Sequence, residues 1–294
     1  MRWLSRPWQL AGMVLPALLI YSLYFTYPVV YSVVQSFTDA KAFGSSTLVG
    51  AENYGSMIED PLFWSSLRNT AIILVIALVV LLPGAFGLAL LLGRRIRGAG
   101  AMRALVFAPN VVAPILIGLI WVFILDPHLG LLNELLRLVG VAEPPEWIGG
   151  TTLSPYSIGG VYVWQTVGFI MTIFYAGLKM LPGDVMEAAA LDGAVGVKRL
   201  RYVTIPMLRE TIGITTVLVI TGSFKIFELV VQLTGGGPVH LSETLVSYTY
   251  HVTFGLQNYG YGMALAVVTS VLGVGVALGY LAFLRRGSGN GGTA

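Results

Sequence analysis

Long runs of apolar residues follow one another along the whole chain, separated by shorter polar stretches. A helix that crosses a bilayer needs about 20 consecutive, mostly apolar residues. Six runs meet this requirement: residues 10–34, 70–92, 104–125, 156–178, 211–233 and 260–284. We therefore expect an all-α integral membrane protein with about six transmembrane helices, organised as a single transmembrane domain over residues 1–294.

The first run is expected to remain in the mature protein. It follows Arg2 and Arg6, is longer than the apolar core of a signal peptide, and ends without a small-x-small cleavage site. These features favour a retained first helix over a cleaved signal peptide.

The basic residues predict the orientation of the chain in the membrane. Most of the 17 Lys and Arg residues fall on one side of the six runs. An excess of Lys and Arg marks the cytoplasmic side, and an even number of spans requires both termini on the same side, so we expect both termini in the cytoplasm. The residues on that side are Arg2, Arg6, Arg94, Arg95, Arg97, Arg103, Lys179, Lys198, Arg199, Arg201, Arg209, Arg285 and Arg286.

The composition excludes several classes of protein. Hydrophobic residues make up 56% of the chain and charged residues 11%, whereas a soluble domain carries roughly 25% charged residues. The absence of cysteine removes disulfides and thiolate metal sites. His128, His240 and His251 fall in segments predicted outside the membrane, which argues against an intramembrane metalloenzyme. We expect no catalytic residues, no metal site and no bound cofactor.

The connector between the fourth and fifth runs, residues 180–210, predicts structure of its own. Pro182, Gly183 and Asp184 are typical of a helix start, and Asp184 is predicted to cap the free N–H groups there. The sequence MEAAALDGA that follows favours a helix. Gly193 interrupts this helix, and Pro206 ends or kinks the helix after it. We expect a rigid helix–Gly–helix hairpin on the cytoplasmic side.

The sequence EAAALDGAVGVKRLRYVTIP in this connector resembles the EAA loop of permease subunits in binding-protein-dependent ABC importers. Glu, two Ala residues, Gly and Pro recur at the spacing of that loop. The resemblance implies that the loop contacts a separate ATPase subunit. The residues implied in this contact are Glu187, Ala188, Ala189, Asp192, Gly193 and Pro206.

Other segments resemble the sugar-transporting branch of the same family, maltose- and glycerol-phosphate-type permeases in particular. They are SLRNT at 66–70, FAPNVVAP at 107–114, GLIWVFILDPHLGLLN at 118–133, VWQTVGF at 163–169, FKIFELVVQLTGGGP at 224–238 and YGYGMALAVV at 259–268. The resemblance implies the type I ABC importer permease fold in a bacterial cytoplasmic membrane. It also implies a second homologous permease subunit, two copies of an ABC ATPase subunit that uses ATP and Mg, an extracytoplasmic solute-binding protein and membrane lipid as partners, with no nucleic acid.

Charged and polar residues inside the fifth run are candidates for the substrate pathway. Lys225 and Glu228 are three residues apart, so on a continuous helix they would share a face and pair, with Thr221 and Gln232 extending the stripe. Charges in a membrane avoid lipid, so this face looks into the bundle or a wet cavity. Both a polar wall of the pathway and a structural ion pair fit this pattern.

Three residues in the third and fourth runs are weaker candidates. Trp164 beside Gln165 offers an aromatic face and an amide, a combination that suits sugars. Asn110 lies between Pro109 and Pro114, which must kink the third helix and free backbone carbonyls. Packing is the commoner role for such residues in a bundle.

Two segments outside the membrane also predict local structure. GLLNELLRLVG at 130–140 places leucines along a helical stripe and predicts a short interfacial helix. TGGGP at 234–238 predicts the end of a helix followed by a turn.

We expect a permease subunit that moves a sugar or sugar derivative inward by alternating access. An importer permease for an amino acid, polyamine or phosphate ester is the alternative. An ion-coupled transporter would need ionisable residues in several spans and usually an internal repeat, and neither is found. No G-x-x-x-x-G-K-[ST] phosphate-binding motif occurs, so ATP hydrolysis is expected in a separate chain.

Overall fold

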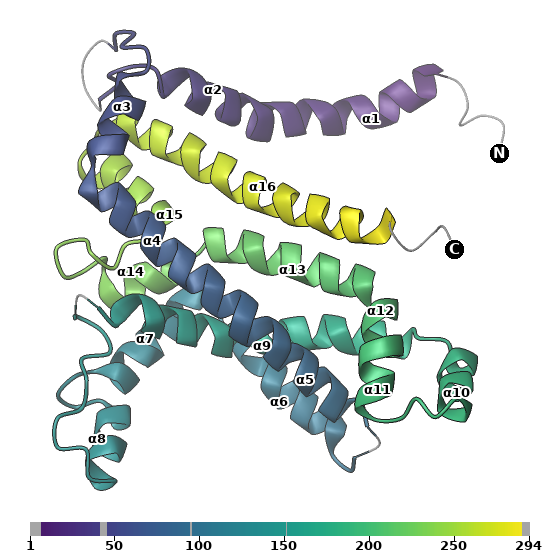
Figure 1. Ribbon diagram of the computed structural model, residues 1–294. Helices are drawn as coiled ribbons and strands as arrows, with labels where there is room; N and C mark the ends of the chain where they lie inside the picture. Colours follow the sequence, from purple (N-terminus) through teal and green to yellow (C-terminus); the bar gives the residue numbers. More distant parts are fainter. Residues whose placement is uncertain (1–6, 42–45, 95, 151, 290–294) are drawn as a thin grey trace. The chain divides into compact units, whose positions relative to one another are not determined.

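The computed structural model describes residues 7–41, 46–94, 96–150 and 152–289 (Figure 1). These residues form helices joined by short connections, and within them β-pairing is limited to the isolated bridges Thr38–Leu48 and Lys41–Asn258. The α-helices are α1 Pro7–Tyr21, α2 Tyr27–Gln35, α3 Glu52–Glu59, α4 Pro61–Ile76, α5 Leu82–Leu92, α6 Ala99–Val111, α7 Pro114–Leu125, α8 Leu131–Leu138, α9 Ser154–Lys179, α10 Gly183–Leu191, α11 Val197–Arg199, α12 Ile205–Met207, α13 Arg209–Phe224, α14 Glu228–Thr234, α15 Leu245–Tyr250 and α16 Tyr259–Gly289. Four π-helical turns join some of them: η1 Ser22–Thr26, η2 Ala77–Leu81, η3 Leu200–Thr204 and η4 His251–Gly255.

Among the described residues, four helical segments are long and apolar enough to span a membrane: Ala11–Gln35, Pro61–Leu92, Ser154–Lys179 and Tyr259–Leu284. Two bent pairs raise the number to six if each pair is one span. The α6–α7 pair bends by 98°, and the pair formed by Val197–Met207 and Arg209–Phe224 bends by 72°. The all-α membrane class is therefore confirmed, and the second span begins at Pro61 rather than at residue 70.

The fifth predicted span is wrong in its outer half. The helix ends at Phe224, Lys225 is the residue that follows it, and α14 begins separately at Glu228. The hydroxyl of Thr244 donates a hydrogen bond of 2.9 Å to the carbonyl of Ile226, so this backbone oxygen has a partner from outside the helix. The hydrogen bond from Thr244 satisfies a backbone carbonyl at the break. The helix can therefore end there inside apolar surroundings.

The chain divides into two compact units. The first contains the described residues up to Asp60 and residues 249–270. Within it, the side-chain amide of Asn53 donates to the carbonyls of Ser36 and Thr38, each at 2.8 Å. The hydroxyl of Tyr261 donates to the carboxylate of Asp60 at 2.6 Å. These polar contacts hold the ends of α2, α3 and α16 together.

The second unit contains residues 61–248 and the described residues from Val271 onward. Helix α9 is its central element, because α4, α5, α6 and α13 all pack against it. Two apolar clusters fill the spaces between these helices. One includes Ile73, Ile117, Ile158 and Leu229, and the other is formed by small residues of η2 and α5 against Met171 and Phe174 of α9.

Gly168 allows a close approach between α6 and α9. A Cβ atom placed on Gly168 would lie 2.6 Å from the Cα of Phe107 in α6. No real Cβ tolerates that distance to backbone, so α6 and α9 pack this closely only because residue 168 is glycine.

Candidate coupling hairpin and polar break

The connector 180–210 forms the predicted hairpin. Helix α10 begins at Gly183, directly after Pro182, as the sequence predicts. Asp184 lies in the first turn of α10, and no side-chain hydrogen bond caps the helix. Its negative charge therefore acts on the helix dipole rather than as the predicted cap.

Gly193 closes the first half of the hairpin. Its φ angle is +77°, in the left-handed region where glycine is strongly favoured. The N–H of Gly193 donates to the carbonyl of Ala190 at 3.1 Å, and the N–H of Ala194 donates to the carbonyl of Ala189 at 2.8 Å. These two bonds form a Schellman motif, which satisfies the last carbonyls of α10 and fixes the direction of the chain.

The residues of the EAA pattern divide into a buried and an exposed set. Ala189 is buried, whereas Glu187, Ala188 and Asp192 are exposed together with Leu191, of which 89% is accessible. The exposed surface of α10 and its C-terminal end thus combines a small side chain (Ala188), an apolar one (Leu191) and acidic ones (Glu187 and Asp192). Pro206 lies in α12, just before the bend that leads into α13.

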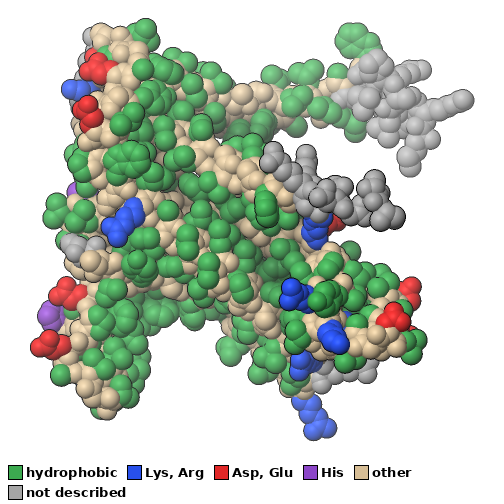
Figure 2. All heavy atoms as spheres, in the orientation of Figure 1, with side chains coloured by type: hydrophobic (Ala, Val, Ile, Leu, Met, Phe, Trp, Pro, Cys, Tyr) green, Lys and Arg blue, Asp and Glu red, His purple; other side chains and the backbone are tan. Residues whose placement is uncertain are grey.

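Basic side chains lie on the side of this hairpin toward the helical bundle of the second unit, and acidic side chains lie at its outer end (Figure 2). Hydrophobic side chains dominate the visible surface of that bundle. Several of the predicted cytoplasmic residues lie on or beside it. They are Arg94, Lys179, Lys198, Arg199, Arg201 and Arg209.

The predicted substrate-pathway residues of the fifth span lie at a break in the helix. Thr221, Lys225 and Glu228 are exposed, and Gln232 is partly buried. Among the ion pairs that the described residues form, none joins Lys225 to Glu228. The predicted pair on a continuous helical face is therefore wrong, because residues 225–227 are not helical.

A five-residue segment that we call the outer strap, residues 241–245, supports this break. Besides the bond from Thr244 to Ile226, the amide of Asn69 in α4 donates to the carbonyls of Leu241 at 2.7 Å and Glu243 at 2.9 Å. The N–H of Leu245 donates to the hydroxyl of Thr70 at 3.0 Å. Two buried polar side chains of the SLRNT segment at 66–70, Asn69 and Thr70, therefore hold the strap.

The kink expected at the prolines of the third span is present. The carbonyl of Val112 lies in the break between α6 and α7 and accepts a hydrogen bond of 3.3 Å from the amide of Gln165. Gln165 is buried, so this amide compensates a backbone carbonyl that the kink frees. Asn110 is partly buried at the end of α6.

Trp164 is partly exposed on α9. Its ring lies edge-on to Trp121 of α7, with ring centroids 5.4 Å apart. The structure thus places Trp164 and Gln165 on different surfaces of α9, one accessible and one turned toward the kink.

The two predicted extramembrane elements are also found. Residues Leu131–Leu138 form α8, whose Leu131, Leu135 and Leu138 are exposed, while Leu132 packs against the core. Helix α14 ends at Thr234 and is followed by Gly235 with a φ of +57°. Within the described ranges, no cluster of His, Asp and Glu could hold a metal ion.

The fold and the hairpin define a membrane transport component, and comparison with known proteins identifies its family. Residues 85–287 match the family described as binding-protein-dependent transport system inner membrane component. The chain belongs to this family.

Several characterised or named relatives align over almost the whole chain. A probable ABC transporter permease of Bacillus subtilis, YurN, is 30% identical, with 92% of this chain and 94% of the relative covered. The sulfoquinovosyl glycerol transport system permease SmoG of Agrobacterium fabrum is 31% identical, covering 97% and 93%. The glycerol-3-phosphate permease UgpA of the same organism is 30% identical, covering 93% and 94%.

Among solved structures, the chain has the fold of a subunit of a bacterial ABC transporter that imports the acidic polysaccharide alginate. The TM-score is 0.83 at 19% identity, and the alignment covers 96% of this chain and 97% of the other. A second structure of an alginate transporter, in complex with a periplasmic protein bound to an alginate pentasaccharide, matches with the same TM-score.

Proposed function

We propose that this chain is one of two transmembrane subunits of an ATP-driven importer that moves a sugar or sugar derivative into the cell. A second, homologous permease subunit completes the pathway, and two copies of a separate ATPase subunit bind ATP and Mg. An extracytoplasmic solute-binding protein delivers the solute, and both termini of the chain lie in the cytoplasm.

The observation that carries this proposal is the Schellman-closed hairpin at residues 183–207. Its first helix and the residue that follows it present Glu187, Ala188 and Asp192 to solvent at the end of the second unit where Lys and Arg gather. An excess of Lys and Arg marks the cytoplasmic side of a membrane protein. Small exposed side chains allow another protein to approach closely, so α10 is suited to dock into an ATPase subunit.

The solute is proposed to pass along Thr221, Lys225 and Glu228. These polar side chains are accessible in an otherwise apolar helical region. Charges exposed to lipid are unfavourable, so their accessibility favours a wet pathway between this chain and its partner. Hydroxyl-rich solutes can accept hydrogen bonds from Lys225 and donate them to Glu228.

The sugar class is supported by relatives named for sulfoquinovosyl glycerol and diacetylchitobiose. Because another relative is named for sn-glycerol-3-phosphate, a phosphate ester is the main alternative solute. Stimulation of ATP hydrolysis in the purified complex by its binding protein, loaded in turn with oligosaccharides, glycerol phosphate and amino acids, distinguishes these solutes.

A crosslinking experiment tests the coupling role. The chain has no cysteine, so Ala188→Cys introduces a single thiol on the exposed surface of α10. We expect a bifunctional thiol reagent to join it to a cysteine in the ATPase subunit, whereas Leu138→Cys on α8, which is 81% exposed, gives no such product. An active complex with no crosslink from position 188 would contradict the proposal.

A further inference from the structure

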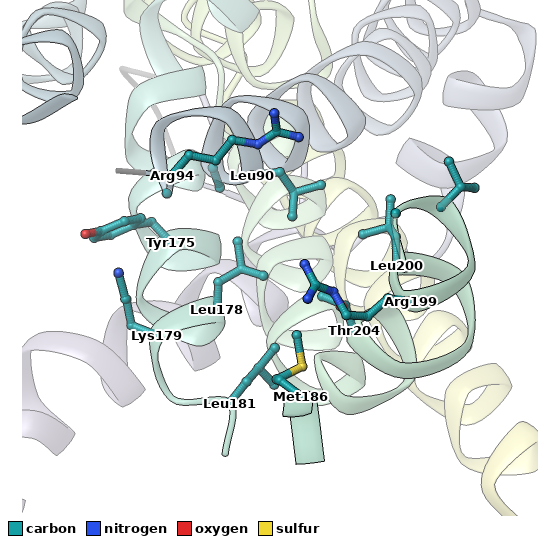
Figure 3. A pocket seen from close by; sticks show the side chains of 14 residues that line it. Leu90, Arg94, Tyr175, Leu178, Lys179, Leu181, Met186, Arg199, Leu200 and Thr204 are labelled. Atoms are coloured by element: carbon teal, nitrogen blue, oxygen red, sulfur yellow. The ribbon is translucent and has the colours of Figure 1, made fainter. Parts of the chain in front are cut away.

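A pocket of about 430 Å³ lies where the ends of α5 and α9 meet the hairpin (Figure 3). Its walls are largely apolar and include Leu90 of α5, Leu178 of α9 and Met186 of α10. Leu200 and Thr204 of η3 complete it on the hairpin side. The pocket is therefore built from two membrane segments and the loop that connects one of them to the next.

Three basic residues line the same pocket, and no acidic residue does. Arg94 follows α5, Lys179 ends α9, and Arg199 ends α11. Figure 3 shows Arg199 extending toward Leu178, while Arg94 and Lys179 lie at other parts of the edge. Among the described residues, no carboxylate forms an ion pair with any of the three. An anion would therefore meet three cations that have no carboxylate counterion among the described residues.

Another basic residue helps to fix one wall. The guanidinium of Arg103 lies 4.3 Å from the centre of the Tyr175 ring and donates a hydrogen bond of 3.1 Å to the carbonyl of Leu92. The ammonium of Lys179 lies 5.6 Å from the same ring. Tyr175 thus holds Lys179 near the pocket edge by a cation–π contact.

The position of the pocket selects the kind of anion. Lys179 and Arg94 directly follow long apolar segments, so they mark the level at which α5 and α9 leave the hydrocarbon of the membrane. A basic rim above apolar walls at this level suits a molecule with a charged head and an apolar tail. Basic pockets between transmembrane helices bind anionic lipid headgroups in this way.

We propose that this pocket binds an anionic phospholipid, with its headgroup at the basic edge formed by Arg94, Lys179 and Arg199 and an acyl chain along Leu90 and Leu178. Bound lipid would connect the spanning helices to the hairpin and hold the hairpin at the membrane surface. This inference requires only that α5 and α9 span the membrane, so its failure would leave the proposed transport function intact.

Native mass spectrometry of the purified transporter complex tests the proposal. The complex is exchanged into nanodiscs of phosphatidylcholine with and without phosphatidylglycerol, and the retained lipid is counted. The test variant carries Arg94→Gln, Lys179→Gln and Arg199→Gln. We expect retention of phosphatidylglycerol to weaken by about fivefold for each charge removed, with no change for phosphatidylcholine.

A matched variant separates a pocket from a general attraction to basic surface. Arg97→Gln, Lys198→Gln and Arg201→Gln remove the same charge from neighbouring exposed positions that do not line the pocket. We expect it to retain phosphatidylglycerol like the unaltered chain. Equal loss in both variants would overturn the proposal.

Two further arms complete the test. The variant Arg94→Lys with Arg199→Lys keeps the positive charges, so we expect it to retain phosphatidylglycerol like the unaltered chain. Retention by this variant would show that replacing these side chains does not by itself disrupt the fold. Inorganic phosphate added without anionic lipid provides a soluble phosphate with no acyl chain. If it raises the melting temperature of the complex as much as phosphatidylglycerol does, the pocket is a soluble-anion site and the lipid assignment is wrong.

Discussion

Single glycines decide the local geometry of this chain at two positions, for different reasons. Gly193 supplies a backbone conformation, because its φ angle of +77° is unfavourable for other residues. Gly168 supplies space, because a side chain there would meet the backbone of α6. The first requirement is local in sequence, whereas the second depends on a residue about 60 positions away.

We expect Gly193→Val to uncouple ATP hydrolysis from transport without preventing membrane insertion. A residue with a Cβ in the left-handed region costs about 1–2 kcal/mol, which redirects the chain after α10. Solute uptake per ATP hydrolysed, measured in proteoliposomes, should fall. Gly183→Ala at the start of α10 is the control, since it has open space and no positive φ. Normal coupling in Gly193→Val would contradict a rigid hairpin.

Gly168→Ala is expected to destabilise the second unit by about 1–3 kcal/mol, because the new methyl group overpacks the α6–α9 contact. Gly160→Ala in the same helix meets no atom within 4 Å and should be neutral. Thermal unfolding of the detergent-solubilised complex measures both. Equal melting temperatures for the two variants would show that α6 and α9 separate readily.

Asp39 gives the first unit a pH-dependent contact. Its carboxylate accepts hydrogen bonds from the backbone N–H and the hydroxyl of Thr47, and these bonds lower the pKa of Asp39 below its usual value of 3.8. The stabilisation is therefore complete above pH 3.8 and is lost as the pH falls through the lowered pKa. We expect the difference in melting temperature between the unaltered chain and Asp39→Ala to shrink over that acidic range. A difference independent of pH would contradict this.

At the scale of elements, apolar periodicity predicted most helices, and polar contacts determined where they break. The fourth and sixth spans were located within a few residues, since each is one uninterrupted apolar helix. The third span was predicted to kink because its prolines are visible in the sequence. The break at residues 225–227 has no proline, and the hydrogen bond at its Ile226 carbonyl comes from Thr244, 18 residues further along the chain. Such a contact leaves no signal in local sequence.

In the candidate site, too, the features set by neighbouring residues were predictable from the sequence and those set by distant residues were not. The hairpin depends on near neighbours, so Gly193 and the EAA pattern located it correctly. The prediction that Lys225 pairs with Glu228 assumed one continuous helix through both residues, but α13 ends at Phe224. Asn69 and Thr70 were missed as supports of the outer strap because their partners lie more than 170 residues away in sequence.

Thr244→Val should weaken the outer strap while keeping the shape of the side chain. The change leaves the carbonyl of Ile226 without its hydroxyl donor in a buried position, which costs about 1–3 kcal/mol. We expect a lower melting temperature together with reduced uptake. Thr221→Val removes an exposed hydroxyl that bonds only within its own helix, and should change the melting temperature little. Equal stability of both variants would show that the break does not need the strap.

At the scale of the whole molecule, the exposed charges at the break provide a test of the pathway. Because Lys225 and Glu228 form no ion pair, we expect Lys225→Met and Glu228→Gln each to reduce uptake, and the double variant to combine both losses additively. Assembly with the partner subunits should be unaffected. Uptake rates and the yield of intact complex measure the two effects. Recovery of uptake in the double variant would instead indicate a pair that forms in another state of the transporter.

The outer strap also limits how the second unit can move. Along its length, Leu241, Glu243 and Leu245 bond to Asn69 and Thr70 of α4, and Thr244 bonds to the break that precedes α14. Sliding of α4 relative to that break must rupture either the three hydrogen bonds between the strap and α4 or the bond from Thr244 to Ile226. Because these bonds couple α4 to the break before α14, we expect both to move together as one rigid group when access to the pathway changes. Spin labels on the exposed sides of α4 and α14 should then keep a constant separation in every nucleotide state.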